Sequence, residues 1–196
     1  GCGLGLTLLV WSDLGDTSRT VGRPLGAQFR EYPELLASQR FWGYALAATL
    51  SAGSFYAYLG GAPFVGQVVL HLSPAEVGYW FAGPSIGYAL GNYLSARFST
   101  RIGMNRMILS GALICSVFLA LGLAVDLMGG LTPLVFFGAV GLMGLGNGMV
   151  LPNANAGMMS VRPELAGTAS GLGGAMAVAG GAGLAALAGA LLHDDT

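Results

Sequence analysis

Long stretches without a charged residue, separated by short gaps that carry the charges, dominate the pattern of this chain. The uncharged stretches are 41–75, 77–96, 107–125, 127–161 and 165–193. A helix needs ~20 mainly apolar residues to cross the hydrocarbon core of a bilayer. Each stretch reaches about that length, and three leave room for a connection. The pattern predicts an all-α integral membrane protein with spans at about 41–65, 77–96, 107–126, 132–156 and 167–192.

Composition supports a membrane protein and excludes several other classes. The chain is 54% hydrophobic and 9% charged, whereas a soluble domain carries roughly 25% charged residues. Its mean hydropathy is +0.68. With a net charge of −1 it has no basic surface for nucleic acid, so lipid is the expected partner. Cys2 and Cys115 have no metal or redox spacing, and we expect them to be packing residues and expect no metal site.

The arginines predict how the chain crosses the membrane. They occupy alternate gaps: Arg19, Arg23, Arg30 and Arg40 in the first, Arg97, Arg101 and Arg106 in the third, and Arg162 in the fifth. Arginine close to the end of a span stays on the cytoplasmic side. Residues 12–40 are therefore predicted to be a cytoplasmic loop, and residues 41–193 a transmembrane half-bundle that ends outside.

Both termini are interpreted as truncated. Residues 1–11 are apolar but too short to span a bilayer, and they lack the cationic start of a signal peptide, so we expect them to be the tail of a further span. Residues 194–196 follow an apolar run directly and are interpreted as a truncated periplasmic end.

Polar side chains form stripes on the first two predicted spans. At 100° per residue, Gly83, Gly87 and Gly91 share one face of span 77–96, where small residues allow close helix packing. The opposite face carries Ser85, Tyr88, Asn92 and Ser95, and the stripe on span 41–65 is formed by Tyr44, Ser51, Ser54 and Tyr58. Such a stripe faces protein or water. Two interpretations remain open, a substrate cavity and interhelical hydrogen bonds without a cavity.

The fourth predicted span carries Asn147, Asn153 and Asn155 around Pro152. An amide in hydrocarbon needs hydrogen-bond partners, and a proline removes a backbone donor and can kink the helix. A gating or cavity role and a helix-end cap are both open. No acid or histidine lies in the middle of a predicted span, so a proton-relay carboxylate is not expected in this chain.

Enzyme motifs fail for lack of structural context. Gly83-Pro84-Ser85-Ile86-Gly87 matches the string of a nucleophile elbow, but the elbow needs a strand-to-helix turn and a His/acid pair. Gly181-Ala-Gly183-Leu-Ala-Ala186 fits a dinucleotide fingerprint without a βαβ unit around it. We expect neither an enzyme nor a cofactor. A hydrolase built on Ser85 would require that serine to react with an alkylphosphonate probe.

Several strings resemble a known transporter family. The strongest is Gly146-Asn-Gly-Met-Val-Leu-Pro152-Asn-Ala-Asn155-Ala, followed by Arg162-Pro-Glu-Leu-Ala-Gly167-Thr-Ala-Ser170-Gly171. Others are Tyr58-Leu-Gly-Gly-Ala-Pro63-Phe64-Val, Ser73-Pro-Ala-Glu-Val-Gly78, and the loop with Arg97, Arg101, Gly103 and Arg106. From about Arg40 to Leu192 the chain resembles the C-terminal half of a major facilitator superfamily transporter, of the bicyclomycin-resistance-type (Bcr/CflA) multidrug efflux group.

The resemblance implies a fold and a mechanism. The chain would hold the tail of span six and spans seven to eleven, with span twelve missing, in the inner membrane of a bacterium. It would export small amphipathic compounds by alternating access with an N-terminal half that also holds the proton-carrying carboxylate. The proton gradient would supply the energy. The arginine loop would be a cytoplasmic latch, for which positive-inside anchoring is the alternative.

These expectations define the candidate residues. The substrate cavity is predicted to contain Tyr44, Ser51, Ser54, Tyr58, Ser85, Tyr88, Asn92 and Asn147. Gating or loop roles are predicted for Arg97, Arg101, Gly103, Arg106, Pro152, Asn153 and Asn155. The alternative function is a membrane assembly module without transport, or an inactive gene fragment, in which the glycine faces serve packing alone.

Overall fold

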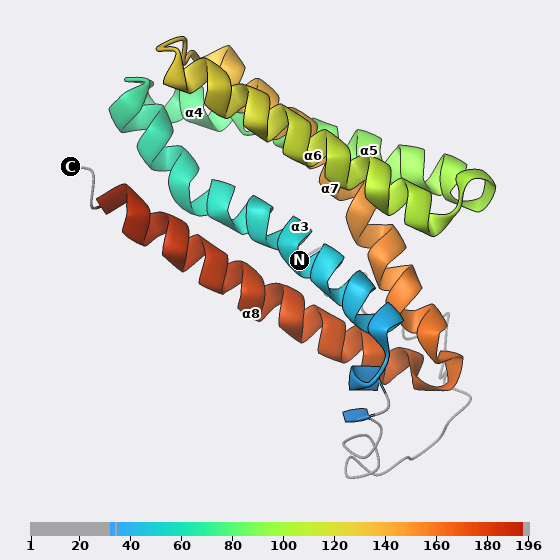
Figure 1. Ribbon diagram of the computed structural model, residues 1–196. Coiled ribbons are helices and arrows are strands. Elements are labelled where there is room, and N and C mark those ends of the chain that lie inside the picture. Colours follow the sequence, from blue (N-terminus) through green and yellow to red (C-terminus); the bar gives the residue numbers. More distant parts are fainter. Residues whose placement is uncertain (1–31, 34, 194–196) are drawn as a thin grey trace, which may run out of the picture. The chain divides into compact units, whose positions relative to one another are not determined.

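The structure is a computed structural model that describes residues 32–33 and 35–193, with side chains to residue 190. The chain divides into two compact units, Gly1–Tyr32 and Pro33–Thr196, and the elements below belong to the second. In order they are α3 (Gln39–Phe64), the π-helix η1 (Val65–Val69), α4 (Pro74–Trp80), α5 (Ala82–Ile102), α6 (Met104–Leu127), α7 (Pro133–Val161), the 3₁₀-helix η2 (Pro163–Leu165) and α8 (Ala166–His193). Every described element is helical, which confirms the all-α fold class (Figure 1).

The helices begin where the sequence provides capping residues. The hydroxyl of Ser38 caps α3 by accepting from the backbone N–H of Phe41, and Thr132 caps α7 in the same way. Ser73 begins α4 with a capping box. The hydroxyl and the backbone N–H of Ser73 both donate to the carboxylate of Glu76, which lowers the pKa of that carboxyl. Gly103, with φ at 93°, makes the tight connection from α5 to α6.

Span 77–96, predicted as one helix, is two helices in the structure. The chain turns at Phe81, between α4 and α5. Pro84 is compatible with the break, because it has no N–H to donate to the carbonyl four residues earlier and falls in the first turn of α5, where that hydrogen bond is not needed. The other four predicted spans coincide with α3, α6, α7 and α8 to within a few residues, except that α7 continues to Val161.

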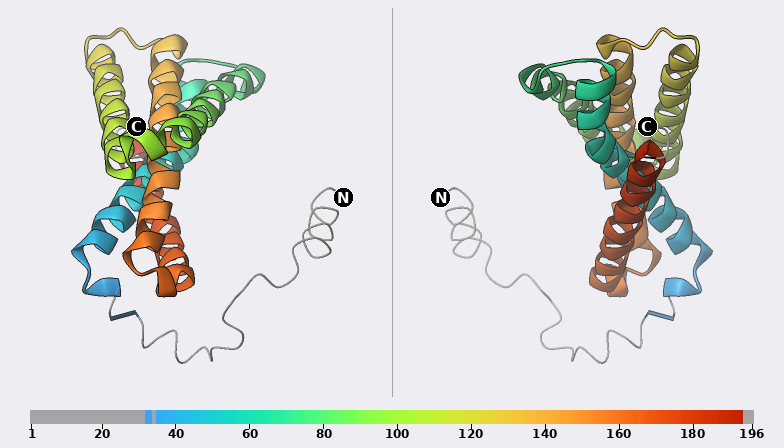
Figure 2. Two further views of the ribbon diagram at one scale, coloured as in Figure 1. Left: turned by 90° about the vertical axis from the view of Figure 1, so that its right-hand side faces the viewer. Right: turned by 90° about the vertical axis from the view of Figure 1, so that its left-hand side faces the viewer.

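α7 is the central helix of the described bundle. It packs against α3, α5 and α6, and α3 also packs along α8. Figure 2 shows α7 between α6 and α5, and Figure 1 shows α8 beside α3. The sequence explains how closely α5 and α7 approach. A Cβ added at Gly91 would lie 2.9 Å from the Cα of Gly148, so the two backbones touch where glycine leaves room.

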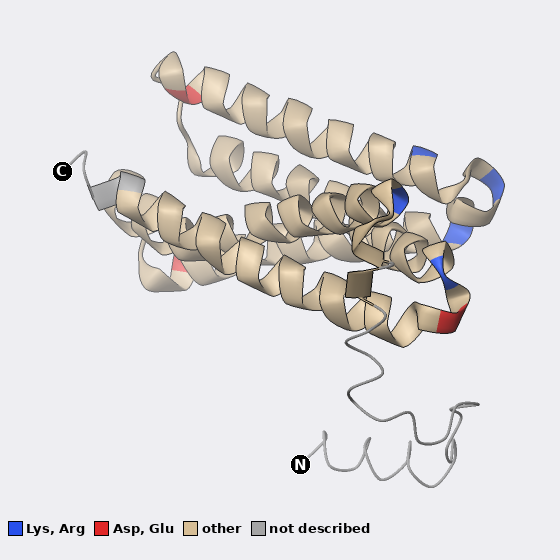
Figure 3. Ribbon diagram, turned by 60° about the horizontal axis from the view of Figure 1, so that its bottom comes forward, with Lys and Arg blue, Asp and Glu red and all other residues tan. Residues whose placement is uncertain are grey.

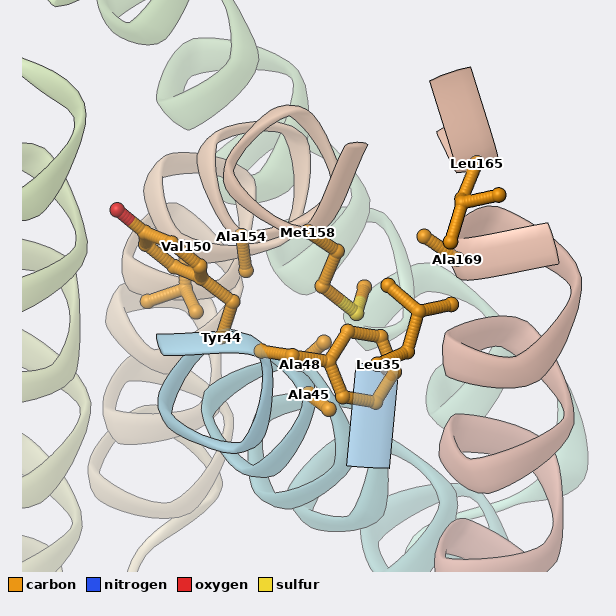
Figure 4. Close-up of a cluster of buried hydrophobic side chains, with 10 residues drawn as sticks. Leu35, Tyr44, Ala45, Ala48, Val150, Ala154, Met158, Leu165 and Ala169 are labelled. Atoms are coloured by element: carbon orange, nitrogen blue, oxygen red, sulfur yellow. The ribbon is translucent and has the colours of Figure 1, made fainter. Parts of the chain in front are cut away.

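Two separate apolar clusters hold the bundle. The first joins Leu35 and the beginning of α3 to the end of α7 and the beginning of α8 through Phe41, Met158 and Leu165 (Figure 4). The second lies towards the other ends of these helices and contains Tyr58, Val77 and Phe137. Between the clusters, at mid-length of α3 and α7, the polar side chains of Ser51 and Asn147 are buried.

The outside of the bundle suits a bilayer. Large apolar side chains such as Leu109, Leu113 and Leu121 are more than half exposed on α6. Among the described helices, α6, α7 and α8 are long and apolar enough to cross a membrane. The polar stripe of α3 and the arginines of α5 lower the hydropathy of those two helices. Figure 3 shows the arginines gathered at one end of the bundle, as alternate cytoplasmic gaps require, and the side of the membrane stays a prediction.

Candidate functional site

A cavity of about 360 Å³ lies between α3, α5 and α7. It brings together three predicted cavity residues, Ser85, Tyr88 and Asn147. Two aromatic residues of α3, Phe55 and Tyr56, complete the wall and were not predicted. A mainly apolar and aromatic wall with a few neutral polar groups is typical of a site for small organic molecules. We call this space the central cavity.

Asn147 lies at the midpoint of α7 and joins three helices. It is fourteen residues from each end of the helix, since 147 − 133 = 14 and 161 − 147 = 14. Its carboxamide oxygen accepts from the hydroxyl of Ser51 on α3 at 2.6 Å and from the thiol of Cys115 on α6 at 3.4 Å. Its amide nitrogen donates to Ser54 at 3.4 Å. A polar node thus fixes the three helices at mid-length, where unpaired amides would be costly.

Ser51 and Ser54 of the α3 stripe both form interhelical hydrogen bonds with Asn147, as one of the two interpretations of the stripe expects. Ser51 is buried, and the hydroxyl of Ser54 donates to the carbonyl of Ser51 at 2.8 Å in addition to accepting from Asn147. Neither serine lines the central cavity. Both border a smaller cavity of about 260 Å³ on the α6 side of α3, together with Cys115 and Asn147. The structure thus places both serines in hydrogen bonds beside this smaller cavity, and their role in substrate binding stays a prediction.

The two tyrosines of the same stripe also lie away from the central cavity. Tyr44 is buried near the arginine end, where its hydroxyl donates to the carboxamide oxygen of Asn105 on α6 at 2.7 Å. Tyr58 is buried among aromatic rings, with its ring centroid 5.1 Å from that of Phe81 and 6.5 Å from that of Phe136. The hydroxyl of Tyr58 has no hydrogen-bond partner among the residues that the structure describes. A helical wheel places all four stripe residues on one face of α3. In the structure that face is covered in turn by Asn105 of α6, by Asn147 of α7 and by the aromatic cluster around Tyr58.

Replacing Tyr58 with phenylalanine is expected to raise the free energy of unfolding by about 1 kcal/mol, because the substitution removes a buried hydroxyl whose desolvation is not compensated. The matched change Tyr44→Phe should lower it by about 0.6 kcal/mol, since an interhelical hydrogen bond is lost. Thermal unfolding of the purified proteins in detergent measures both. A Tyr58→Phe variant that keeps its stability and loses transport would show that the hydroxyl of Tyr58 contacts the substrate.

The polar residues predicted on one face of α5 take different positions in the structure. Ser85 and Tyr88 are exposed towards the central cavity, and Asn92 continues the stripe one turn later. Ser95 was predicted on the polar face opposite the glycines. In the structure it is only 4% exposed and is buried on the packing face, together with Gly87 and Gly91. Its hydroxyl accepts a hydrogen bond from the amide of Asn153 on α7.

A groove of about 770 Å³ lies between the last turns of α5 and the second half of α7. Asn92 of α5, Gly103 of the connection from α5 to α6, and Pro152 and Asn153 of α7 line it, so four predicted residues share one site. α7 stays helical through Pro152. Asn153 is buried, whereas Asn155 is exposed on another face of α7 and lines none of these cavities. Asn155 therefore does not belong to this site. We call this space the polar groove.

Comparison with known families decides what kind of protein holds these cavities. The sequence profile described as Major Facilitator Superfamily matches residues 2–191. The chain belongs to this superfamily. It is therefore a multi-pass membrane protein of a transporter family, and a lipid bilayer is its environment. No curated protein and no solved structure gives a significant match.

The predicted arginine loop is helical in this member of the superfamily, since Arg97 and Arg101 lie in the last turns of α5 and Arg106 in the first turn of α6. The three arginines form no ion pair with any described residue. Arg97, Arg101 and Arg106 are all exposed. The ion pair found in the described part of the chain is a neighbouring one, from Arg162 to Glu164 at 3.8 Å, on the surface. A latch would need acidic partners on another element. The latch therefore stays a prediction, with positive-inside anchoring as the alternative.

The two motif strings lie inside helices rather than in the turns that the corresponding enzyme motifs require. Ser85 lies inside α5, and its hydroxyl donates to the carbonyl of Phe81 in the preceding turn at 3.1 Å. The strand-to-helix turn of a nucleophile elbow is absent at this position. Gly181 and Gly183 lie inside α8, where Gly181 packs against the ring of Tyr56. Among the described residues, no group of His, Cys, Asp and Glu could hold a metal ion.

Proposed function

We propose that this chain forms half of the substrate path of an exporter of small amphipathic compounds. The observation that carries the proposal is the central cavity, whose aromatic and neutral polar wall lies at mid-length of α3 and α7. In transporters of this architecture, substrate sites lie near the bilayer midplane, and rocking of two halves opens them alternately to each side. An N-terminal half would supply the opposite wall.

The bicyclomycin-resistance-type group is the proposed subfamily, and the inner membrane of a bacterium the proposed location. Support comes from the string between Gly146 and Asn155, which contains both Asn147 of the polar node and Asn153 of the polar groove. Two of the asparagines of this string, Asn147 and Asn153, thus line the central cavity and the polar groove. The gathering of arginines at one end supports an orientation with that end in the cytoplasm.

Proton antiport is the proposed source of energy, with the proton carried outside this bundle. The acids within residues 35–190 are Glu76, Asp126 and Glu164, and each lies at the end of a helix or in a connection. A carboxylate that alternates between protonated and charged states would need to reach the interior. We place it in the N-terminal half, together with the partners of the arginine loop.

A second candidate is a membrane assembly module without transport. The hydrogen bonds that Ser51 and Ser54 make with Asn147 favour it, because they turn part of the polar stripe into helix packing. The glycine contacts between α5 and α7 likewise contribute to helix packing. The central cavity is the feature that a module with only a packing role would not need.

Replacing Tyr88 with alanine is expected to lower export about tenfold, because the loss of one aromatic contact is worth up to about 1.5 kcal/mol. Tyr93 is the matched control on the same helix, since it is 64% exposed and lines none of the cavities described. Efflux of fluorescent amphipathic dyes from cells and from proteoliposomes with an imposed pH gradient measures both variants, with expression quantified in parallel.

Export that falls for Tyr88→Ala and stays normal for Tyr93→Ala supports the proposed cavity. Equal losses in the two variants would show a general effect on folding rather than a substrate contact. If the unaltered protein exports no dye in either assay, the assembly module is favoured. Export that does not respond to the pH gradient would remove proton coupling and leave the cavity in place.

A further inference from the structure

Asn147 borders two spaces and has its hydrogen-bond partners beside only one of them. The three side chains that bind its carboxamide, those of Ser51, Ser54 and Cys115, all line the smaller cavity on the α6 side of α3. None of the three lines the central cavity, which Asn147 also lines. The side of Asn147 towards the central cavity is therefore the side without partners.

The two serines determine which way the carboxamide of Asn147 is turned. Ser54 gives its single hydroxyl hydrogen to the carbonyl of Ser51 at 2.8 Å, so towards Asn147 it can only accept. The amide nitrogen of Asn147 accordingly faces Ser54, at 3.4 Å. The carboxamide oxygen faces the hydroxyl of Ser51, which donates to it at 2.6 Å.

The donors and acceptors of this carboxamide are not all used within the bundle. Its oxygen can accept two hydrogen bonds, and Ser51 and Cys115 each direct a donor at it. Its nitrogen carries two hydrogens, and Ser54 is the one acceptor that it has among the described residues. One N–H group of Asn147 is left over for an acceptor outside the described bundle.

This N–H group is the most deeply buried donor in the wall of the central cavity. Asn147 is only 2% exposed, whereas Tyr56 and Tyr88 of the same wall are more than a third exposed. Ser85 is not a competing donor, because its hydroxyl hydrogen is engaged by the carbonyl of Phe81 at 3.1 Å. A buried N–H without an acceptor costs free energy, so an occupant of the cavity that supplies an acceptor is favoured.

We infer that Asn147 donates its remaining N–H group to the substrate, and that the central cavity therefore selects apolar or aromatic compounds that carry a carbonyl oxygen. This inference rests on the proposed export function and narrows its substrate class. Water can serve the N–H group in the empty cavity. A compound of the same shape without a good acceptor would displace that water and leave the N–H group unpaired, which is how such a site discriminates.

Two coumarins of nearly the same shape test the inference. A diethylaminocoumarin carries a lactone carbonyl, and in its thiocarbonyl analogue a sulfur, which accepts hydrogen bonds only weakly, replaces that oxygen. Each competes with the tritiated coumarin for binding to the purified complete transporter, after correction for partition into detergent. We expect the carbonyl compound to bind about tenfold more tightly than the thiocarbonyl compound. In Asn147→Ala the carbonyl compound should bind about tenfold more weakly, and the two affinities should become about equal.

Cys115→Ala is the matched control, because it removes a contact to the oxygen of Asn147 and leaves the N–H group in place. It should keep the preference of about tenfold for the carbonyl compound. The preference compares two compounds on one protein, so a loss of stability or expression alone does not change it.

Equal affinities of the two coumarins for the unaltered protein would overturn the inference before any variant is made. A preference that persists in Asn147→Ala would show that the donor is another residue. A preference that is lost in Cys115→Ala as well would show a general effect of the polar node, and would also overturn direct donation. Export of other amphipathic dyes without binding of either coumarin would contradict the substrate class alone, whereas failure to export any dye would contradict the proposed function itself.

Discussion

Gly148→Ala is expected to lower the free energy of unfolding by about 3 kcal/mol, a large effect for a single methyl group. A Cβ at residue 148 would lie 2.7 Å from the backbone nitrogen of Asn92 and 2.9 Å from the Cα of Gly91. These are backbone atoms of α5, so no side-chain rotation can relieve the overlap. The two helices would have to move apart, which would also deform both cavities.

Gly138 offers a matched control in the same helix. A Cβ there has no atom within 4 Å, so Gly138→Ala should raise the free energy of unfolding by up to about 1 kcal/mol through helix propensity. Thermal unfolding in detergent, with size-exclusion profiles of the membrane extract, measures both variants. A Gly148→Ala protein as stable as Gly138→Ala would mean that α5 and α7 are not in backbone contact.

Asn147→Leu is expected to abolish export and to lower the free energy of unfolding by about 2 kcal/mol or more. The variant breaks three interhelical hydrogen bonds, each worth about 0.6 kcal/mol on average in a membrane protein. It also leaves the buried hydroxyl of Ser51 without its acceptor, which adds a desolvation cost of about 1 kcal/mol. The leucine would face the central cavity with no polar group to offer a substrate.

Asn155→Leu is the control for this substitution, because it makes the same change on α7 at an exposed position. Its stability and its export should stay within experimental error of the parent. Measuring unfolding and dye efflux on the same preparations separates the two effects of Asn147. If Asn147→Leu unfolds like the parent, the polar node does not hold the helices together.

Much of the fold follows from the sequence by simple physics. Uncharged runs of membrane length correspond to α3, α6, α7 and α8, because a bilayer leaves the backbone no alternative to helical hydrogen bonds. Ser38, Thr132 and Gly103 mark helix ends that can be recognised from their residue types. The break at Phe81 is harder to see, since it depends on whether Pro84 falls in the first turn of a new helix or inside an old one.

The candidate site was predicted less completely, and the reason is geometric. Periodicity tells which residues share a face, but not which helix covers that face. The stripe of α3 was correct as a stripe, yet Asn105, Asn147 and an aromatic cluster each cover part of it. Phe55 and Tyr56 were missed because aromatic residues on an apolar helix give no signal of their own. The partner helix decides that they line a cavity.

The arrangement of polar groups ties the fold to its function. Two apolar clusters close the bundle at its ends, and the node at Asn147 lies between them at the middle of three helices. The central cavity opens beside that node. A bundle built for packing alone has no need of an aromatic cavity at mid-length, whereas the proposed exporter would bind its substrate there.

Protection of an introduced cysteine by substrate tests the central cavity most directly. In a background with Cys2→Ser and Cys115→Ala, single variants Tyr88→Cys and Tyr93→Cys are labelled with a small maleimide, with and without a dye that the protein exports. The central cavity predicts that the dye slows labelling of residue 88 severalfold and leaves residue 93 unchanged. Equal labelling of residue 88 with and without the dye, while export continues, would show that the substrate binds elsewhere.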